Sequence, residues 1–210
     1  MSKILIADDH AMVRAGIRQY LEAEPSIRAI GEAASGQETL DQLRTNDWNL
    51  VLLDIFMPDQ SGLDILRHIQ NDYPNVRVLM LSGLPEKQYA VSVLRAGASG
   101  YLPKESPPED LIKAVQTVLA GRRYVSAEVA ELLVAGMDKD PGSQQHERLS
   151  AREFQVLTKL ASGLTVSQIA EELQLSVKTV STYRSRVLEK MGLKTNADLT
   201  SYALRHGLVQ

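Results

Sequence analysis

Five short apolar runs alternate with stretches of helical periodicity along the first 120 residues. The apolar runs lie at residues 3–7, 27–31, 50–53, 76–81 and 99–102. Apolar residues at the spacing of one helix face recur at residues 11–22, 37–45, 62–71, 86–96 and 107–120. Apolar runs followed by amphipathic helices are typical of parallel strands covered on both faces. The pattern predicts an α/β domain with a doubly wound, parallel, five-stranded sheet. The flavodoxin-like strand order 2-1-3-4-5 is the common solution at this length.

The pattern changes after residue 120. A helix is expected near residues 126–136, and residues 138–147 are polar, with a Pro-Gly pair and no apolar residue. Such a stretch has nothing to bury, so it predicts a flexible linker. From residue 149 onward the periodicity is helical, with four helices predicted at about residues 150–162, 165–173, 176–191 and 196–206. The tight turn between the second and third predicts a small all-α helix-turn-helix domain. We expect domains at residues 1–122 and 148–210, joined by a helix and linker at residues 123–147.

Composition narrows the class of protein. Of 210 residues, 44% are hydrophobic and 23% are charged, as in ordinary globular proteins, and no cysteine is present. A disulfide framework and a thiolate metal site are therefore excluded. No apolar stretch approaches the length of a membrane span, and the N-terminus lacks a basic region followed by an apolar one. We expect a cytoplasmic protein with no membrane partner.

The net charge of −3 conceals an asymmetry between the two predicted domains. Residues 1–120 carry 11 basic and 16 acidic groups, whereas residues 148–210 carry 9 basic and 5 acidic groups. The basic C-terminal domain is a candidate for binding nucleic acid.

Several polar residues stand where the predicted strands end. Asp8 and Asp9 follow the first run, Asp54 follows the third, Ser82 closes the fourth and Lys104 follows the fifth. The carboxyl ends of parallel strands share one edge of a sheet, where ligands bind. Three carboxylates there repel one another unless a cation lies among them, and Mg²⁺ prefers oxygen ligands and phosphate. The side chain of Lys104 can neutralise a phosphoryl oxygen. The edge therefore predicts a site that handles a phosphoryl group.

Histidines have no part in this predicted site. The four histidines show no ligand spacing, so no histidine metal site is expected, and His10 is interpreted as the start of the first helix.

The third helix of the C-terminal domain has two unlike faces. Val180, Val187, Leu188 and Met191 form an apolar stripe. The free face is small, polar and basic, which suits the major groove of DNA. Together with the start of the preceding helix it supplies the candidate DNA-binding residues Thr165, Ser167, Lys178, Thr179, Ser181, Thr182, Arg184, Ser185 and Arg186.

The first 120 residues resemble the receiver domain of two-component response regulators. The resemblance rests on Asp8-Asp9-His10, on Asp54 within residues 53–58, on Ser82-Gly83 and on residues 97–104. It implies that a sensor histidine kinase phosphorylates Asp54, and that Lys104 pairs with the phosphoryl oxygens. It also implies Mg²⁺ ligation by Asp9, Asp54 and the backbone carbonyl of Phe56, with Asp8 acting largely through water. Ser82 and Tyr101 would form the switch.

The C-terminal domain is similar to the LuxR/FixJ-type DNA-binding domain. The matching residues are 149–153, 156–157, 169–170, 175–180 and 188–192, and Tyr183 departs from a histidine common in that family. Both resemblances together place the chain in the NarL/FixJ class of response regulators. They imply a non-enzymatic regulator whose phosphorylation controls homodimerisation and binding to double-stranded promoter DNA, with RNA polymerase as a further candidate partner.

Two alternatives stay open. One is an orphan regulator that binds DNA without phosphorylation. The other is a phosphohydrolase with an aspartyl intermediate, which the apolar residues Phe56 and Leu84 argue against because they would hinder an attacking water. The same two residues suggest slow loss of phosphate from Asp54.

Overall fold

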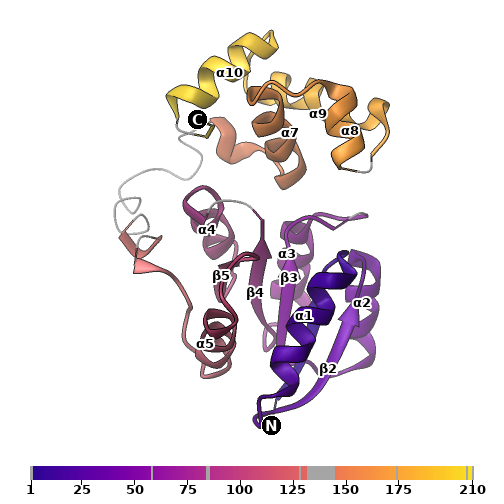
Figure 1. Ribbon diagram of the computed structural model, residues 1–210, viewed down its shortest axis with the longest axis vertical. Coiled ribbons are helices and arrows are strands. Elements are labelled where there is room, and N and C mark those ends of the chain that lie inside the picture. Colours follow the sequence, from indigo (N-terminus) through magenta and orange to yellow (C-terminus); the bar gives the residue numbers. More distant parts are fainter. Residues whose placement is uncertain are drawn as a thin grey trace. The chain divides into compact units, whose positions relative to one another are not determined.

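The computed structural model describes residues 2–57, 59–83, 86–127, 129–131, 145–173, 175–206 and 208–209. The chain divides into two compact units, Met1–Asp138 and Lys139–Gln210 (Figure 1). Leu84, residues 132–136 of the predicted connecting helix and residues 138–144 of the predicted linker lie outside the described residues.

The first unit contains a parallel sheet of five strands. They are β1 (Ser2–Ala7), β2 (Ile27–Ala33), β3 (Leu50–Asp54), β4 (Arg77–Ser82) and β5 (Gly100–Pro103), in the order β2-β1-β3-β4-β5. The predicted flavodoxin-like order is confirmed. All five residues of β3 are buried, which explains why its sequence is a continuous apolar run ending in an acid.

Helices cover both faces of this sheet (Figure 1). They are α1 (Ala11–Glu22), α2 (Gly36–Thr45), α3 (Gly62–Asp72), α4 (Glu86–Arg95) and α5 (Pro108–Leu119). One face packs Ile17 of α1 and Val115 of α5 against alternate strand residues such as Ile4 and Leu52. The residues of opposite parity, Leu5 and Val51 among them, are equally buried on the other face, where α2 and α3 lie against each other.

A close backbone contact shapes the loop between β3 and α3. A Cβ atom on Gly62 would lie 2.1 Å from the backbone oxygen of Asp54, so only glycine fits there. The backbone N–H of Gly62 also donates to the oxygen of Ile55, at 2.9 Å. The start of α3 is thereby held against the end of β3.

The second unit is helical. A 3-10 helix (Gln145–Arg148) lies where the sequence predicted the end of the linker, followed by α7 (Ala151–Ala161), α8 (Val166–Glu172), α9 (Val177–Lys190) and α10 (Asn196–Arg205). Ser150, Thr165, Ser176 and Thr195 cap the four α-helices, and the capping box predicted for Ser150 and Glu153 is present. The predicted four-helix fold is confirmed. Among the described residues, no helix has both the length and the apolar character needed to cross a bilayer.

Candidate functional site

The register of the sheet brings the predicted strand-end residues to one edge. Ala7 of β1 pairs with Leu53 of β3, so the next residue of each segment, Asp8 and Asp54, lies at the same end of the sheet. Ser82 ends β4 beside Pro103 of β5, and the next residue, Lys104, donates its backbone N–H to the Ser82 oxygen at 2.8 Å. Four neighbouring strand ends thus contribute polar groups to one place.

Lys104 lies between two buried carboxylates. Its Nζ is 2.8 Å from Asp54 Oδ2 and 2.7 Å from Asp8 Oδ2, and the side chains of Asp8 and Asp54 are 0% and 1% exposed. Burial disfavours the ammonium charge, but the attraction of Asp54 and Asp8 outweighs it, so the pKa of Lys104 is raised above its usual value. Lys104 therefore carries its positive charge in this site.

The carboxyl group of Asp54 has a raised pKa. Burial raises its pKa to about 6; Lys104 opposes the shift and the like charge of Asp8 adds to it. The backbone N–H of Phe56 also donates to Asp54 Oδ1 at 3.2 Å. Near neutral pH most of the Asp54 population is ionised, and the carboxylate is held in one orientation by donors on both oxygens.

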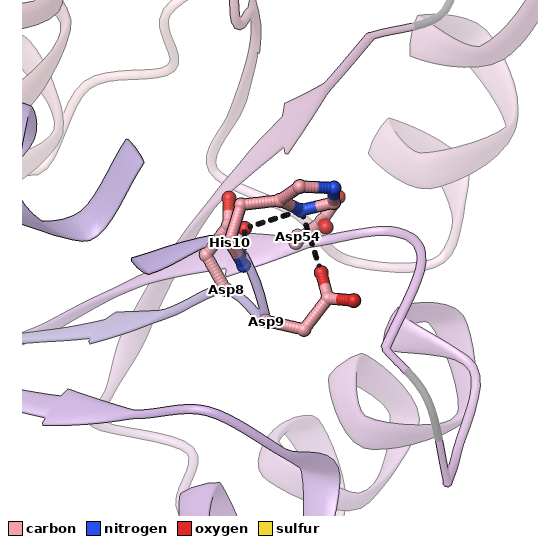
Figure 2. Close-up of side chains that lie close together, drawn as sticks. All are labelled: Asp8, Asp9, His10 and Asp54. Atoms are coloured by element: carbon pink, nitrogen blue, oxygen red, sulfur yellow. Dashed lines mark hydrogen bonds and ion pairs between the residues drawn. The ribbon is translucent and has the colours of Figure 1, made fainter. Parts of the chain in front are cut away.

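His10 joins this cluster, which the sequence analysis missed (Figure 2). His10 precedes α1 as its N-cap, and its Nδ1 lies 2.7 Å from Asp9 Oδ1 and 3.1 Å from Asp8 Oδ1. The ligand atoms of Asp8, Asp9, His10 and Asp54 all lie within 4.8 Å of one another. The sequence signal for this is adjacency, because His10 directly follows the two acids, whereas the spacing between the four histidines carries no such signal.

The cluster has the chemistry of a cation site. Asp8 Oδ2 is buried, and no donor among the described residues reaches it with hydrogen-bond geometry, although Lys104 Nζ lies 2.7 Å away as an ion pair. A carboxylate oxygen has more than one lone pair, so Asp8 Oδ2 can accept a further partner beside Lys104. The backbone of Asp8 is held by Arg14 of α1, whose Nη1 donates to the Asp8 backbone oxygen at 2.7 Å. Arg14 Nε in turn pairs with Glu32 of β2 at 3.1 Å.

The predicted switch residues lie inside the first unit. Ser82 and Tyr101 are both 0% exposed. Ser82 ends β4 at the edge that carries the cluster, and Tyr101 lies in β5, three residues before Lys104. Phe56 is partly buried directly after β3.

The candidate DNA-binding residues are separate from this cluster, in the second unit. In α9, Val180, Val187 and Met191 are buried as predicted, and Leu188 is partly buried. The opposite face is open: Lys178, Ser181, Thr182, Ser185 and Arg186 are exposed, and Thr179 and Arg184 are partly so. Thr165 and Ser167, at the start of α8, are exposed as well. A shallow hollow on α9 is lined by Lys178, Thr179, Thr182, Tyr183 and Arg186.

Some of these polar groups already have partners within the second unit. Arg184 Nε donates to Asn196 Oδ1 at 2.7 Å, which ties α9 to the start of α10. The hydroxyl of Thr165 caps α8, accepting from the backbone of Gln168 at 3.3 Å. These contacts hold the side chains of Arg184 and Thr165 in defined orientations.

Each of the two units matches a known protein family. The model of the response regulator receiver domain matches residues 4–116, and that of the luxR family of bacterial regulatory proteins matches residues 147–203. The response regulator UvrY of Escherichia coli is 36% identical over 209 residues, covering 99% of this chain and 96% of UvrY. The response regulator GacA of Pseudomonas protegens is 34% identical over 209 residues, covering 100% of this chain and 98% of GacA.

A solved structure of similar fold spans the same length. RcsB from Salmonella enterica serovar Typhimurium, bound to the promoter rprA in the presence of phosphomimetic BeF3⁻, matches with a TM-score of 0.63 and 28% identity. The match covers 96% of this chain and 98% of RcsB. The chain therefore belongs to the response regulators, with a receiver domain followed by a DNA-binding domain of the LuxR family.

Proposed function

We propose that Asp54 accepts a phosphoryl group from a sensor histidine kinase, and that this controls dimerisation and promoter binding. The observation that carries the proposal is the contact of Lys104 with both Asp54 and Asp8 at the end of the sheet. The ionised carboxylate of Asp54 can attack phosphorus, and the nearby ammonium of Lys104 can balance the added negative charge. Lys104 reaches this position from β5, so a new group on Asp54 changes the contacts of a distant strand.

Mg²⁺ is the cofactor that fits these residues. Asp9 and Asp54 would hold it with the backbone carbonyl of Phe56, and the buried carboxylate of Asp8 would act through water. When bound, the cation supplies positive charge to the phosphoryl oxygens during transfer. The chain's own groups orient the reaction: the Phe56 N–H and Lys104 hold the two Asp54 oxygens.

The switch would pass from Lys104 to the buried residues beside it. In the proposal, Ser82 donates its hydroxyl to the phosphoryl group and Tyr101 repacks in response, which alters the surface near α4 and β5. The full burial of Ser82 and Tyr101 supports this, because a buried packing arrangement is more readily two-state than a surface one.

Residues 148–210 would then bind double-stranded promoter DNA as a symmetric dimer. The small polar face of α9 would lie in the major groove, with Lys178 and Arg186 exposed toward DNA. The RcsB complex with a promoter in the presence of a phosphomimetic supports this use of the fold. Because bacterial promoter DNA lies in the cytoplasm, we propose a cytoplasmic location. We further propose that the protein is a regulator without enzymatic turnover and that RNA polymerase is a further partner.

Intact-mass measurement after incubation with acetyl phosphate and Mg²⁺ tests the proposal. Wild type, Asp54→Ala and a surface control, Asp64→Ala at an exposed position of α3, are compared, with oligomeric state measured on the same samples. We expect one added phosphoryl group on wild type and the control, none on Asp54→Ala, and a shift toward dimer only where phosphate is added.

Each other outcome points to a different function. A phosphoryl group added to Asp54→Ala would show that another residue is the acceptor. Phosphate-free protein that binds its promoter as tightly as the phosphorylated form would favour the orphan regulator. Rapid multiple turnover of acetyl phosphate would favour the phosphohydrolase.

A further inference from the structure

Two hydroxyl groups on the free face of α9 donate their protons to the helix itself. Thr182 Oγ1 donates to the backbone oxygen of Lys178 at 2.9 Å, and Ser185 Oγ donates to that of Ser181 at 3.0 Å. Both side chains are exposed, and each bonds to the carbonyl one turn earlier in the helix. A hydroxyl has a single proton to donate and two lone pairs with which to accept. Thr182 and Ser185 therefore present acceptors, not donors, to a ligand on this face.

A threonine in the first unit has the same arrangement with its acceptor in use. In α2, Thr45 Oγ1 donates to the backbone oxygen of Asp41 at 3.0 Å, as Thr182 does to Lys178. The same Thr45 oxygen accepts from the side-chain amide nitrogen of Asn46, also at 3.0 Å. An amide NH₂ group is a donor of the same kind as the amino group of a nucleobase. A threonine hydroxyl can thus accept from an NH₂ group while it keeps its bond to the helix.

This acceptor character favours some bases over others in the major groove. Adenine and cytosine present amino groups there, whereas guanine presents two acceptors, N7 and O6. A hydroxyl that accepts from an amino group keeps its bond to α9 and gains another. A hydroxyl that meets guanine must first give up its bond to the helix carbonyl in order to donate. The difference is about one hydrogen bond, which corresponds to roughly twofold to tenfold in affinity.

The methyl group of Thr182 separates adenine from cytosine. Thr182 is exposed and lines the shallow hollow on α9, where a base edge can reach it. Thymine carries a methyl group in the major groove, and the methyl group of threonine makes apolar contact with it. An A·T pair offers an amino group and a methyl group on one edge, whereas a G·C pair offers an amino group alone. The side chain of Thr182 is therefore complementary to an A·T pair.

The cations beside Thr182 limit this preference to one position. Lys178 lies one helical turn before Thr182 and Arg186 one turn after it, and both are exposed and line the same hollow. Their side chains donate only, so they suit phosphates or the acceptors of guanine. The A·T preference is thus expected at the pair that faces Thr182, between the contacts of the two cations.

We propose that Thr182 selects an A·T base pair in each half-site. Its hydroxyl accepts from the adenine amino group and its methyl group packs against the thymine methyl group, while Ser185 accepts from an amino group of a neighbouring pair. The inference rests on the proposed binding of promoter DNA and adds a base preference to it.

Selection from duplex DNA with a randomised central segment locates this pair. The full chain, incubated with acetyl phosphate and Mg²⁺, is compared as wild type, Thr182→Val and Thr45→Val. Valine keeps the shape of threonine but removes the hydroxyl. Thr45 is the matched control, because it is an exposed threonine with the same helix bond in the first unit. We expect Thr45→Val to enrich the wild-type site, and Thr182→Val to lose roughly twofold to tenfold of the preference at one A·T position.

Two modified bases at that position separate the hydroxyl contact from the methyl contact. Deoxyuridine in place of thymidine removes the methyl group, and purine in place of adenine removes the amino group. By fluorescence anisotropy, deoxyuridine should weaken wild-type binding about fourfold, as expected for one buried methyl group. Purine should weaken it roughly twofold to tenfold. Thr182→Ser, which lacks the methyl group, should respond only to purine, and Thr182→Val only to deoxyuridine. Unchanged helical circular dichroism shows that the variants are folded.

Two results would overturn the inference while leaving the proposed function in place. One is a wild-type preference for G·C at the position where Thr182→Val alters the enriched site, since the hydroxyl would then donate. The other is the same enriched site, with the same preferences, for wild type and Thr182→Val, since Thr182 would then read no base. Wild type that enriches no sequence at all would instead remove sequence-specific promoter binding, and with it the proposed function.

Discussion

Lys104 reaches from the end of β5 past the intervening strand β4 and places its Nζ 2.8 Å from Asp54 Oδ2 at the end of β3. The carboxylate that would be modified and the lysine that responds to it therefore belong to different strands. Because the strands of this sheet are tightly packed, a change in the contacts of Asp54 can alter the position of β5 and of the helices packed beside it.

The pKa of Asp54 predicts a pH-dependent loss of stability. An acid whose pKa is raised in the folded protein stabilises the fold below its unfolded-state pKa, and that stability is lost as pH rises through about 6. The side chain introduced by Asp54→Asn carries no charge. At pH 7 without Mg²⁺, the free energy of unfolding of this variant should therefore be about 2–3 kcal/mol higher than that of wild type.

Urea unfolding followed by the fluorescence of Trp48, the only tryptophan, measures this in the first unit. The difference between variant and wild type should shrink as pH is lowered from 7 toward 4. A difference that stays constant over this range would show that Asp54 is not buried in its charged form. Added Mg²⁺ should stabilise wild type and leave Asp54→Asn nearly unchanged.

Phe56 is expected to slow the loss of phosphate from Asp54. Its backbone holds Asp54 Oδ1, and its side chain is apolar and partly buried next to the acid, so an attacking water finds no acceptor there. Phe56→Asn keeps the backbone contact and adds a polar group that can orient water. Phosphorylated Phe56→Asn should lose phosphate several times faster than wild type when followed by intact mass. Equal lifetimes would contradict this prediction.

Gly62 and Gly16 form a matched pair of glycines. A Cβ on Gly62 would lie 2.1 Å from the Asp54 oxygen and 2.9 Å from Ile55 Cα, so Gly62→Ala must displace backbone beside the acid. We expect it to lower the free energy of unfolding by about 2 kcal/mol or more and to slow phosphorylation. Gly16, inside α1, has nothing within 4 Å of such an atom, and Gly16→Ala should stabilise by about 0.5–1 kcal/mol. Equal effects of the two substitutions, again by Trp48 fluorescence, would refute the steric argument.

Glu153 ties α7 to α9 in the second unit. Its carboxylate is 3% exposed and accepts from Lys190 Nζ and from the Ser150 N–H, each at 2.7 Å. Burial alone would raise its pKa, but the contacts with Lys190 and Ser150 outweigh this and lower it. The contribution is therefore present at neutral pH and is lost as pH falls through the lowered pKa.

Lys190→Met leaves the buried carboxylate without its cation, and thermal unfolding followed by helical circular dichroism should show a loss of about 1–2 kcal/mol. The partial exposure of Lys190 keeps the loss at this level. Lys159→Met, which removes a cation from the more exposed pair with Glu172, should change stability by less than about 0.5 kcal/mol. A similar loss in both variants would mean that burial of Glu153 does not matter.

Arg186 and Arg184 should differ in their effect on DNA binding. Arg186 is exposed on α9, whereas Arg184 Nε is engaged by Asn196. If Arg186 contacts a phosphate, Arg186→Ala weakens binding across sequences and reduces the salt slope of log K by about 1. Arg184→Ala should reduce that slope less. Fluorescence anisotropy with a promoter fragment across a salt series measures both, and a larger slope change for Arg184→Ala would reverse the assignment.

Local patterns in the chain were enough to predict most of the fold. Apolar runs and 3.6-residue periodicity are properties of neighbouring residues, so the five strands, the helices of both units and the capping box at Ser150 and Glu153 were readable directly. The placement of Asp8, Asp54, Ser82 and Lys104 at one edge followed as well, because parallel strands must end together.

What required the tertiary structure were distances between side chains from different elements. That Lys104 contacts both Asp8 and Asp54, that burial raises the pKa of Asp54 to about 6, and that Arg184 is held by Asn196 all depend on register and on side-chain rotamers. The direction of the His10 ring toward Asp8 and Asp9 belongs to the same group. Sequence periodicity describes which face a residue occupies, whereas these contacts depend on where the faces of separate elements meet once they pack.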